Sequence, residues 1–213
     1  MCGIVGYIGN EEKKKIIING LKELEYRGYD SAGLAVMDES ANIKYFKAVG
    51  KLNNLEEKMK DFTSQGFGVA IGHTRWATHG KPTELNAHPH FGDFSFVVHN
   101  GIIENYIELK DELEANGVKF LSQTDTEVIV HLFEKNFKAS NDAFKAYEAT
   151  IKRLKGAYAT LLITKAAPGE IFFAKNAAPL IVAKNDKNEI FFSSSDAPLI
   201  GLANTAAYLD DQI

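Results

Sequence analysis

Cys2 has the clearest potential for chemistry, because it is the only cysteine in the chain and directly follows Met1. Removal of the methionine would leave one residue that carries both a thiol and a free α-amine. The thiolate is the reactive form of cysteine. Ordinary pKa values of about 8.5 for the thiol and about 7.7–8.0 for the α-amine allow proton exchange near neutral pH. The α-amine can therefore act as the general base for its own side chain. We expect Gly3 to leave room for a substrate carbonyl; the alternative is an incidental cysteine at a frayed chain end.

Three further polar clusters lie at the ends of predicted strands or the start of a predicted helix, at residues 73–79, 99–101 and 124–127. Arg75 offers a planar guanidinium that can clamp a carboxylate, or form a surface salt bridge. The Asn100 amide and the Gly101 N–H suit an oxyanion hole, although this pair is also common in turns. Asp125 at a helix start is favoured by the helix dipole, which would keep it ionised and able to hold an ammonium group. Trp76 fits either the core or a lid.

Taken together, these groups predict a site for an amino acid with a reactive acyl group in its side chain. Glutamine has a carboxylate, an ammonium group and a side-chain amide, which are the three groups that such a site would bind. Its carboxylate would face Arg75, its ammonium would face Asp125, and its side-chain amide would lie at Cys2. The sequence therefore predicts L-glutamine as the substrate.

Five of the six histidines lie between residues 73 and 99, which raises a zinc or iron site as an alternative. The segment His88-Pro89-His90 lacks the helical spacing of a zinc-protease motif, and no second cysteine or Glu-x-x-His accompanies it. A histidine can also act as a general base, but the α-amine of Cys2 already fills that role. We therefore expect no metal and no other cofactor, and a metallohydrolase stays the alternative.

Composition limits the class of protein. The 213 residues fit one domain, and 45% hydrophobic residues suffice for a full core. A net charge of -4 makes nucleic acid an unexpected partner; the run from Lys13 to Lys15 is interpreted as a solvated helical turn. One cysteine excludes a disulfide framework and fits a reducing cytoplasm. There is no secretory signal, and no run of eighteen apolar residues that would span a membrane.

The elements that must position these groups follow from apolar patterning. The run from Ile4 to Gly9 predicts a buried strand that holds Cys2 at a sheet end. Further strands are predicted at 32–37, 43–49, 68–73, 94–99, 158–164, 170–175, 180–184 and 189–194. Helices are predicted at 12–25, 52–62, 104–116, 124–136 and 141–155. The fourth of these begins with a capping box, in which Thr124 is the N-cap and Glu127 reaches back to it. The lack of regular βαβ alternation favours an α+β fold of antiparallel sheets covered by helices.

The chain resembles the class II (N-terminal-nucleophile) glutamine amidotransferases over nearly its whole length. The motifs that carry the resemblance are Met1-Cys2-Gly3-Ile4-Val5-Gly6, the stretches 26–33 and 73–80, Asn86-Ala87-His88-Pro89-His90, and the stretch 98–105. The resemblance implies a four-layer αββα sandwich, with Cys2 as nucleophile and base and with Asn100 and Gly101 as the oxyanion hole. It implies that glutamine is bound by Arg75, Thr78, His79 and Asp125, that Trp76 closes over it, and that His88 and Arg27 lie nearby.

Within this family, the motifs are most similar to those of a branch in which ammonia passes through a channel to a second half of the enzyme. There it converts fructose 6-phosphate to glucosamine 6-phosphate, and the full-length enzymes are expected to be homodimers. We expect residues 1–213 to be the glutaminase domain, shortened near its C-terminus, without the two sugar-isomerase domains. A related phosphoribosyl-transferring amidotransferase would be expected to carry Gln in place of Tyr29. A glutamine-sensing module without turnover is the remaining alternative.

Overall fold

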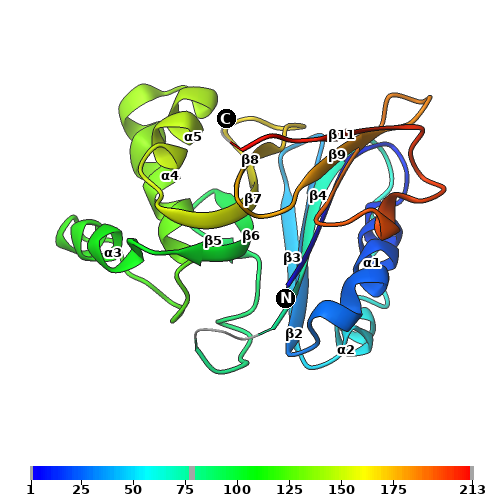
Figure 1. Ribbon diagram of the computed structural model, residues 1–213, viewed down its shortest axis with the longest axis horizontal. Coiled ribbons are helices and arrows are strands. Elements are labelled where there is room, and N and C mark those ends of the chain that lie inside the picture. Colours follow the sequence, from blue (N-terminus) through cyan, green and yellow to red (C-terminus); the bar gives the residue numbers. More distant parts are fainter. Residues whose placement is uncertain (1, 77–79, 212–213) are drawn as a thin grey trace.

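The computed structural model describes residues 2–76 and 80–211, and it is built from two antiparallel sheets that pack face to face between layers of helices (Figure 1). Helices α1 and α2 cover the outer face of the larger sheet, and α3, α4 and α5 lie on the side of the smaller sheet. The α+β class and the four-layer αββα arrangement expected from the sequence are therefore confirmed.

The larger sheet has the strand order β11-β9-β10-β1-β4-β2-β3. Its strands are β1 (Gly3–Gly9), β2 (Ser31–Asp38), β3 (Ile43–Val49), β4 (Gly68–Arg75), β9 (Ile181–Lys184), β10 (Ile190–Ser193) and β11 (Thr205–Tyr208). The smaller sheet has the order β5-β6-β7-β8. Its strands are β5 (His90–Phe91), β6 (Ser95–Ile103), β7 (Gly156–Thr164) and β8 (Phe172–Asn176).

The helices connect and cover these strands. They are α1 (Lys13–Leu24), α2 (Leu52–Lys58), α3 (Tyr106–Ala115), α4 (Glu127–Ser140) and α5 (Ala143–Ile151), with short 3-10 turns η1 (Glu25–Arg27) and η2 (Ala197–Leu199). None of the helices in the described part of the chain is both long and apolar enough to cross a bilayer.

Three apolar clusters fill the three spaces between the four layers. In β1, Ile4 belongs to the cluster between the sheets, whereas its neighbour Val5 packs with Ile17 and Leu21 of α1. Successive side chains of a strand point to opposite faces of a sheet, so a strand covered on both faces needs apolar residues at consecutive positions. This requirement explains why β1 is a continuous apolar run. The third cluster joins the smaller sheet to α3, α4 and α5.

The structure corrects several local expectations. Strand β4 continues through Arg75. Strand β6 continues through Ile103, so Asn100 and Gly101 lie within a strand and not in a turn. Both are paired with β7, opposite Ala159 and Tyr158, respectively. Long-range pairing with β7 has therefore overridden the local turn preference of the Asn-Gly pair. The short strand β5 and the exposed strand β11 were not predicted at all.

The run of three lysines is also not a fully solvated turn. Lys13 is buried, and its ammonium donates hydrogen bonds to the backbone oxygens of Gly66 and Glu11. Lys14 donates to the carbonyls of Met59 and Phe62 in the segment that follows α2. These lysines therefore tie the start of α1 to the loop that precedes β4.

Leu161 tests the contribution of the core between the sheets. Its side chain is fully buried in that cluster, so we expect Leu161→Ala to lower the free energy of unfolding by about 2–5 kcal/mol, measured by urea denaturation. The matched control is Leu121→Ala, because Leu121 is 56% exposed; it should change stability by less than about 0.5 kcal/mol. Equal effects of the two substitutions would contradict this description of the core.

Candidate active site

Cys2 lies directly before β1, in the middle of the larger sheet. The pairing of β1 with β4 sets Gly3 opposite Thr74 and brings the thiol to Trp76. The Trp76 N–H donates to Cys2 Sγ over 3.3 Å, and the Trp76 carbonyl oxygen lies 3.6 Å from the same sulfur. Burial raises the pKa of the Cys2 thiol, while the Trp76 N–H and the positive charge of Arg75 act in the opposite direction.

Gly3 allows close packing around β1. A Cβ at this position would lie 2.7 Å from Leu24 Cβ and 2.8 Å from Thr74 Oγ1. The missing side chain therefore allows α1 and β4 to approach β1 closely, a reason for glycine that the sequence did not predict.

Asn100 of the smaller sheet reaches Cys2, and Gly101 follows it in β6. The Asn100 amide Nδ2 donates to the backbone oxygen of Cys2 over 3.2 Å. Gly101 has φ +122, and a Cβ there would lie 2.0 Å from the carbonyl oxygen of Ala157. Only glycine fits this backbone conformation beside β7. The two expected oxyanion donors are consecutive residues of β6, and Asn100 contacts Cys2.

Arg75 ends β4 and is 4% exposed. Its Nη2 donates to the Gly80 carbonyl oxygen over 3.4 Å, and its own carbonyl oxygen accepts from the Asp30 N–H over 3.0 Å. A Cβ on Gly28 would lie 2.8 Å from the backbone of both Arg75 and Trp76. The glycine of the Arg-Gly-Tyr-Asp stretch is therefore required for the close contact that supports the Arg75-Trp76 segment.

Trp76 is 42% exposed and meets Tyr29 edge to face, with ring centroids 5.4 Å apart. This position beside the thiol suits a lid better than a core residue. Thr78 and His79, the other expected glutamine ligands on this segment, lie outside the described residues.

Asp125 is buried, and its Oδ2 accepts from the Ile103 N–H over 2.7 Å. The carboxylate thus lies at the end of β6, the strand that also carries Asn100. Arg27 is placed differently: its Nη1 donates to the Ser194 carbonyl oxygen over 3.1 Å. Ser194 in turn accepts from the Ile4 N–H through its hydroxyl, so Arg27 braces β1 from the end of β10.

A layer of buried imidazoles lies between the sheets behind these groups. His88 stacks on His73 with ring centroids 3.9 Å apart. The Thr126 hydroxyl lies between His88 Nε2, at 3.1 Å, and His99 Nδ1, at 3.0 Å. Burial lowers the pKa of each of these histidines, which keeps them neutral. Within residues 2–76 and 80–211, no group of three or more His, Cys, Asp or Glu side chains is arranged to hold a metal ion.

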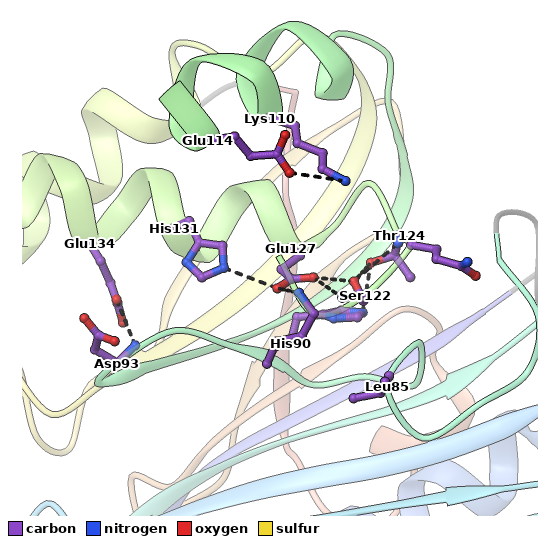
Figure 2. A network of polar contacts seen from close by, with 12 residues as sticks. Leu85, His90, Asp93, Lys110, Glu114, Ser122, Thr124, Glu127, His131 and Glu134 are labelled. Carbon is purple, nitrogen blue, oxygen red and sulfur yellow. Dashed lines mark hydrogen bonds and ion pairs between the residues drawn. The ribbon is translucent and has the colours of Figure 1, made fainter. Parts of the chain in front are cut away.

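The predicted capping box at the start of α4 is wrong. The helix begins at Glu127 after Thr126, which makes no side-chain cap bond. The Glu127 carboxylate instead accepts from the backbone N–H groups of Leu121 and Ser122, at 2.8 and 2.7 Å, and from the Ser122 hydroxyl at 2.5 Å. On its other side it meets His131 Nε2 at 3.3 Å (Figure 2). Glu127 therefore anchors the loop that presents Asp125, a role that a local sequence pattern did not reveal.

Comparison with known proteins decides the family. A family model described as a glutamine amidotransferase domain matches residues 75–201. The chain belongs to the glutamine amidotransferase family. The matched range includes Asn100, Gly101 and Asp125, together with His88 and His99 of the buried histidine layer.

Curated amidotransferase relatives include two proteins named glutamine–fructose-6-phosphate aminotransferase (isomerizing). The protein from Campylobacter jejuni is 68% identical over 99% of this chain, and the one from Helicobacter pylori strain J99 is 60% identical over 84% of it. The chain spans only 35% and 30% of the lengths of these relatives.

Solved amidotransferase structures confirm the fold. The glutamine phosphoribosylpyrophosphate amidotransferase of B. subtilis matches with a TM-score of 0.81 and 27% identity, over 98% of this chain and 44% of that protein. A structure titled as the allosteric regulatory enzyme of purine biosynthesis matches with a TM-score of 0.82 and 28% identity, again over 98% of this chain and 44% of that one.

Glu127 gives a test of the loop anchor in this amidotransferase domain. Burial alone would raise the pKa of Glu127, but hydrogen bonds from His131, Ser122 and the loop N–H groups outweigh burial and hold it well below its usual range. The folded pKa thus lies below the unfolded value of about 4.3, so the ionised carboxylate stabilises the fold above that pH. This stabilisation is lost as the pH falls towards the folded pKa.

We therefore expect Glu127→Gln to reduce the free energy of unfolding at pH 7 by about 1.5–3 kcal/mol. The difference from wild type should shrink below about pH 4. The control is Glu114→Gln, because Glu114 makes only an exposed ion pair with Lys110 at 3.8 Å; it should cost less than about 1 kcal/mol. A difference that stays constant down to pH 2.5 in urea denaturation would contradict the role of the ionised carboxylate.

Proposed function

We propose that this chain is the glutamine-hydrolysing part of a glutamine–fructose-6-phosphate aminotransferase, with Cys2 as the nucleophile. The observation that carries the proposal is the convergence on Cys2 of Trp76 from the end of β4 and Asn100 from β6. The 68% identity to the Campylobacter jejuni protein supports the assignment within the family.

The reaction requires a free α-amine at Cys2, so Met1 must first be removed. The α-amine accepts the thiol proton, and Sγ attacks the side-chain amide carbon of glutamine. The tetrahedral oxyanion accepts hydrogen bonds from the Gly101 N–H and the Asn100 amide. An amide nitrogen carries two hydrogens, so Asn100 Nδ2 can keep its bond to the Cys2 carbonyl and still donate to the oxyanion. The protonated amine gives its proton to the leaving nitrogen, ammonia departs, and water hydrolyses the thioester to release glutamate.

The bound amino acid is held by opposite charges at its other end. We assign its carboxylate to Arg75 and its ammonium to Asp125. The Ile103 N–H donates to Asp125 Oδ2, so we assign the ammonium to Oδ1. Thr78 and His79 complete the substrate-binding set, and Trp76 covers the substrate. His88 and Arg27 support the site from the histidine layer and from β10, respectively.

The ammonia acceptor lies outside this chain. We infer that residues 1–213 form the glutaminase domain of a longer, homodimeric enzyme whose sugar-isomerase domains use fructose 6-phosphate. A cytoplasmic location suits a catalytic thiol, because that compartment keeps thiols reduced. The phosphoribosylpyrophosphate amidotransferase of B. subtilis shares the fold, but its 27% identity makes its acceptor the weaker candidate. Residue 29 is tyrosine in this chain, where glutamine would be expected in the phosphoribosyl-transferring branch. This difference also favours fructose 6-phosphate as the acceptor.

Cys2→Ala tests the covalent mechanism. Removing the nucleophile should lower glutamate release by at least about a thousandfold, while glutamine affinity in isothermal titration calorimetry should stay within about threefold, because the binding groups remain. Intact mass spectrometry must show that Met1 is absent from the wild-type sample. Residual turnover within tenfold of wild type would contradict a covalent role for Cys2.

Arg75→Lys tests the carboxylate clamp. Lysine keeps the charge but loses the planar fork that binds a carboxylate with two hydrogen bonds. We expect glutamine binding to weaken by about 1.5–3 kcal/mol, or roughly 10- to 150-fold in Kd. Arg153→Lys is the matched control, because Arg153 follows α5 and pairs with Glu112. The Arg153→Lys variant should bind glutamine with wild-type affinity. Unchanged affinity of Arg75→Lys would mean that the carboxylate is bound elsewhere.

A further inference from the structure

His73 is a buried residue to which the proposed mechanism gives no task. It lies on β4, opposite Ile4 of β1, and its side chain enters the space between the sheets. Its Nε2 lies 3.0 Å from Asn100 Oδ1 and 3.1 Å from the His99 carbonyl oxygen. Both partners are acceptors, so Nε2 must carry the hydrogen and donate to them.

We propose that His73 is the positioning residue that orients the Asn100 amide for catalysis. This inference rests on the proposed function of Asn100 as an oxyanion donor. With Oδ1 turned to His73, the amide nitrogen points to Cys2, where it donates to the backbone oxygen over 3.2 Å. The opposite orientation would place the amide hydrogens against the Nε2 hydrogen and set Oδ1 against the Cys2 carbonyl oxygen, with no donor toward Cys2. The His73 bond at Oδ1 therefore selects the same amide orientation as the Cys2 carbonyl does at Nδ2.

The surroundings of His73 allow only one form of its ring. Burial lowers the pKa of His73 to about 3, so the ring is neutral and has a single N–H. The stacked ring of His88, with its centroid 3.9 Å away, covers one face. Among residues 2–76 and 80–211, Nδ1 has no hydrogen-bond partner, so no acceptor there favours a hydrogen on this nitrogen. The imidazole is thus fixed in position and in tautomer before any substrate binds.

This contact also connects two separate sheets. His73 belongs to the sheet that holds Cys2, and Asn100 belongs to the sheet that supplies the oxyanion donors. Among the described residues, the Asn100 side chain makes two hydrogen bonds. Its Nδ2 donates to the Cys2 carbonyl oxygen, and its Oδ1 accepts from His73. The relative position of nucleophile and oxyanion donor therefore depends on His73.

Two substitutions separate donation from bulk. His73→Met keeps an apolar volume but removes the donor, so the Asn100 amide can turn. Loss of one oxyanion donor costs about 10²–10³ in kcat, and we expect kcat for glutamate release to fall by roughly 10- to 100-fold with KM changed less than about threefold. His73→Gln places an amide N–H near the Nε2 position and should recover kcat to within about fivefold of wild type. His73→Asn is too short to reach Asn100 and should resemble the methionine variant.

A double-mutant cycle shows whether His73 acts through Asn100. Asn100→Ala should itself lower kcat, and adding His73→Met to it should lower kcat by less than about threefold more. A purely structural role for His73 would instead lower kcat in both backgrounds alike, together with the melting temperature. The inference is overturned by that result, or by wild-type kcat in a folded His73→Met or His73→Asn.

One measurement needs no variant. Two-bond ¹H–¹⁵N correlation spectra of the wild-type chain should show His73 as the neutral Nε2–H tautomer, and an Nδ1–H tautomer would overturn the inference even if every variant failed to fold. The proposed function fails separately, if the wild-type chain without Met1 releases no glutamate or if Asn100→Ala is fully active. Impaired Asn100→Ala with unimpaired His73→Met would refute the role of His73 alone.

Discussion

The antiparallel pairing of β1 with β4 is the constraint on which the site depends. It runs over seven residue pairs, from Gly3 opposite Thr74 to Gly9 opposite Gly68. A shift of this register by one residue would turn every side chain of β1 to the other face. Ile4 would leave the core between the sheets, and Cys2 would no longer meet the backbone of Trp76. The apolar side chains on both faces of β1 therefore hold the thiol in place as much as they stabilise the fold.

The space between the sheets changes character along its length. Around Ile71 and Leu161 it is filled by aliphatic side chains, whereas near Cys2 it holds imidazoles, hydroxyls and a guanidinium. Buried polar groups are costly unless they are hydrogen-bonded, and here the bonds run between the two sheets or to the loop before α4. The polar layer thus fixes the sheets relative to each other, and an apolar core alone would not define the site at the level of single hydrogen bonds.

The sequence was sufficient for the elements with strong patterning. The strand expected at 43–49 is β3 with the same bounds, and the αββα layering followed from a resemblance carried by long motifs. It was insufficient where a distant partner decides the conformation. Asn100 and Gly101 are extended because β7 lies beside them, and no local signal marks that pairing.

Short and exposed strands also escaped prediction. Strand β5 has two residues, and all four residues of β11 are exposed, so neither shows an apolar pattern. Among the candidate site residues, Cys2, Arg75 and Asn100 were predicted because their functional groups suggest a reaction. Glu127 and His73 were not predicted to contact the residues that they do. Glu127 bonds to the loop before its helix and to His131, and His73 bonds to Asn100 on the other sheet.

The position of β1 in the sheet also limits the order in which the larger sheet can form. Strand β1 lies between β4 and β10, and its register with β10 joins Val5 to Ser193. Its second neighbour is therefore synthesised long after β1, and such pairings of distant segments slow folding, because a long loop must be closed first. Strand β1 therefore lacks one of its two neighbours in the sheet until residues 190–193 have been made.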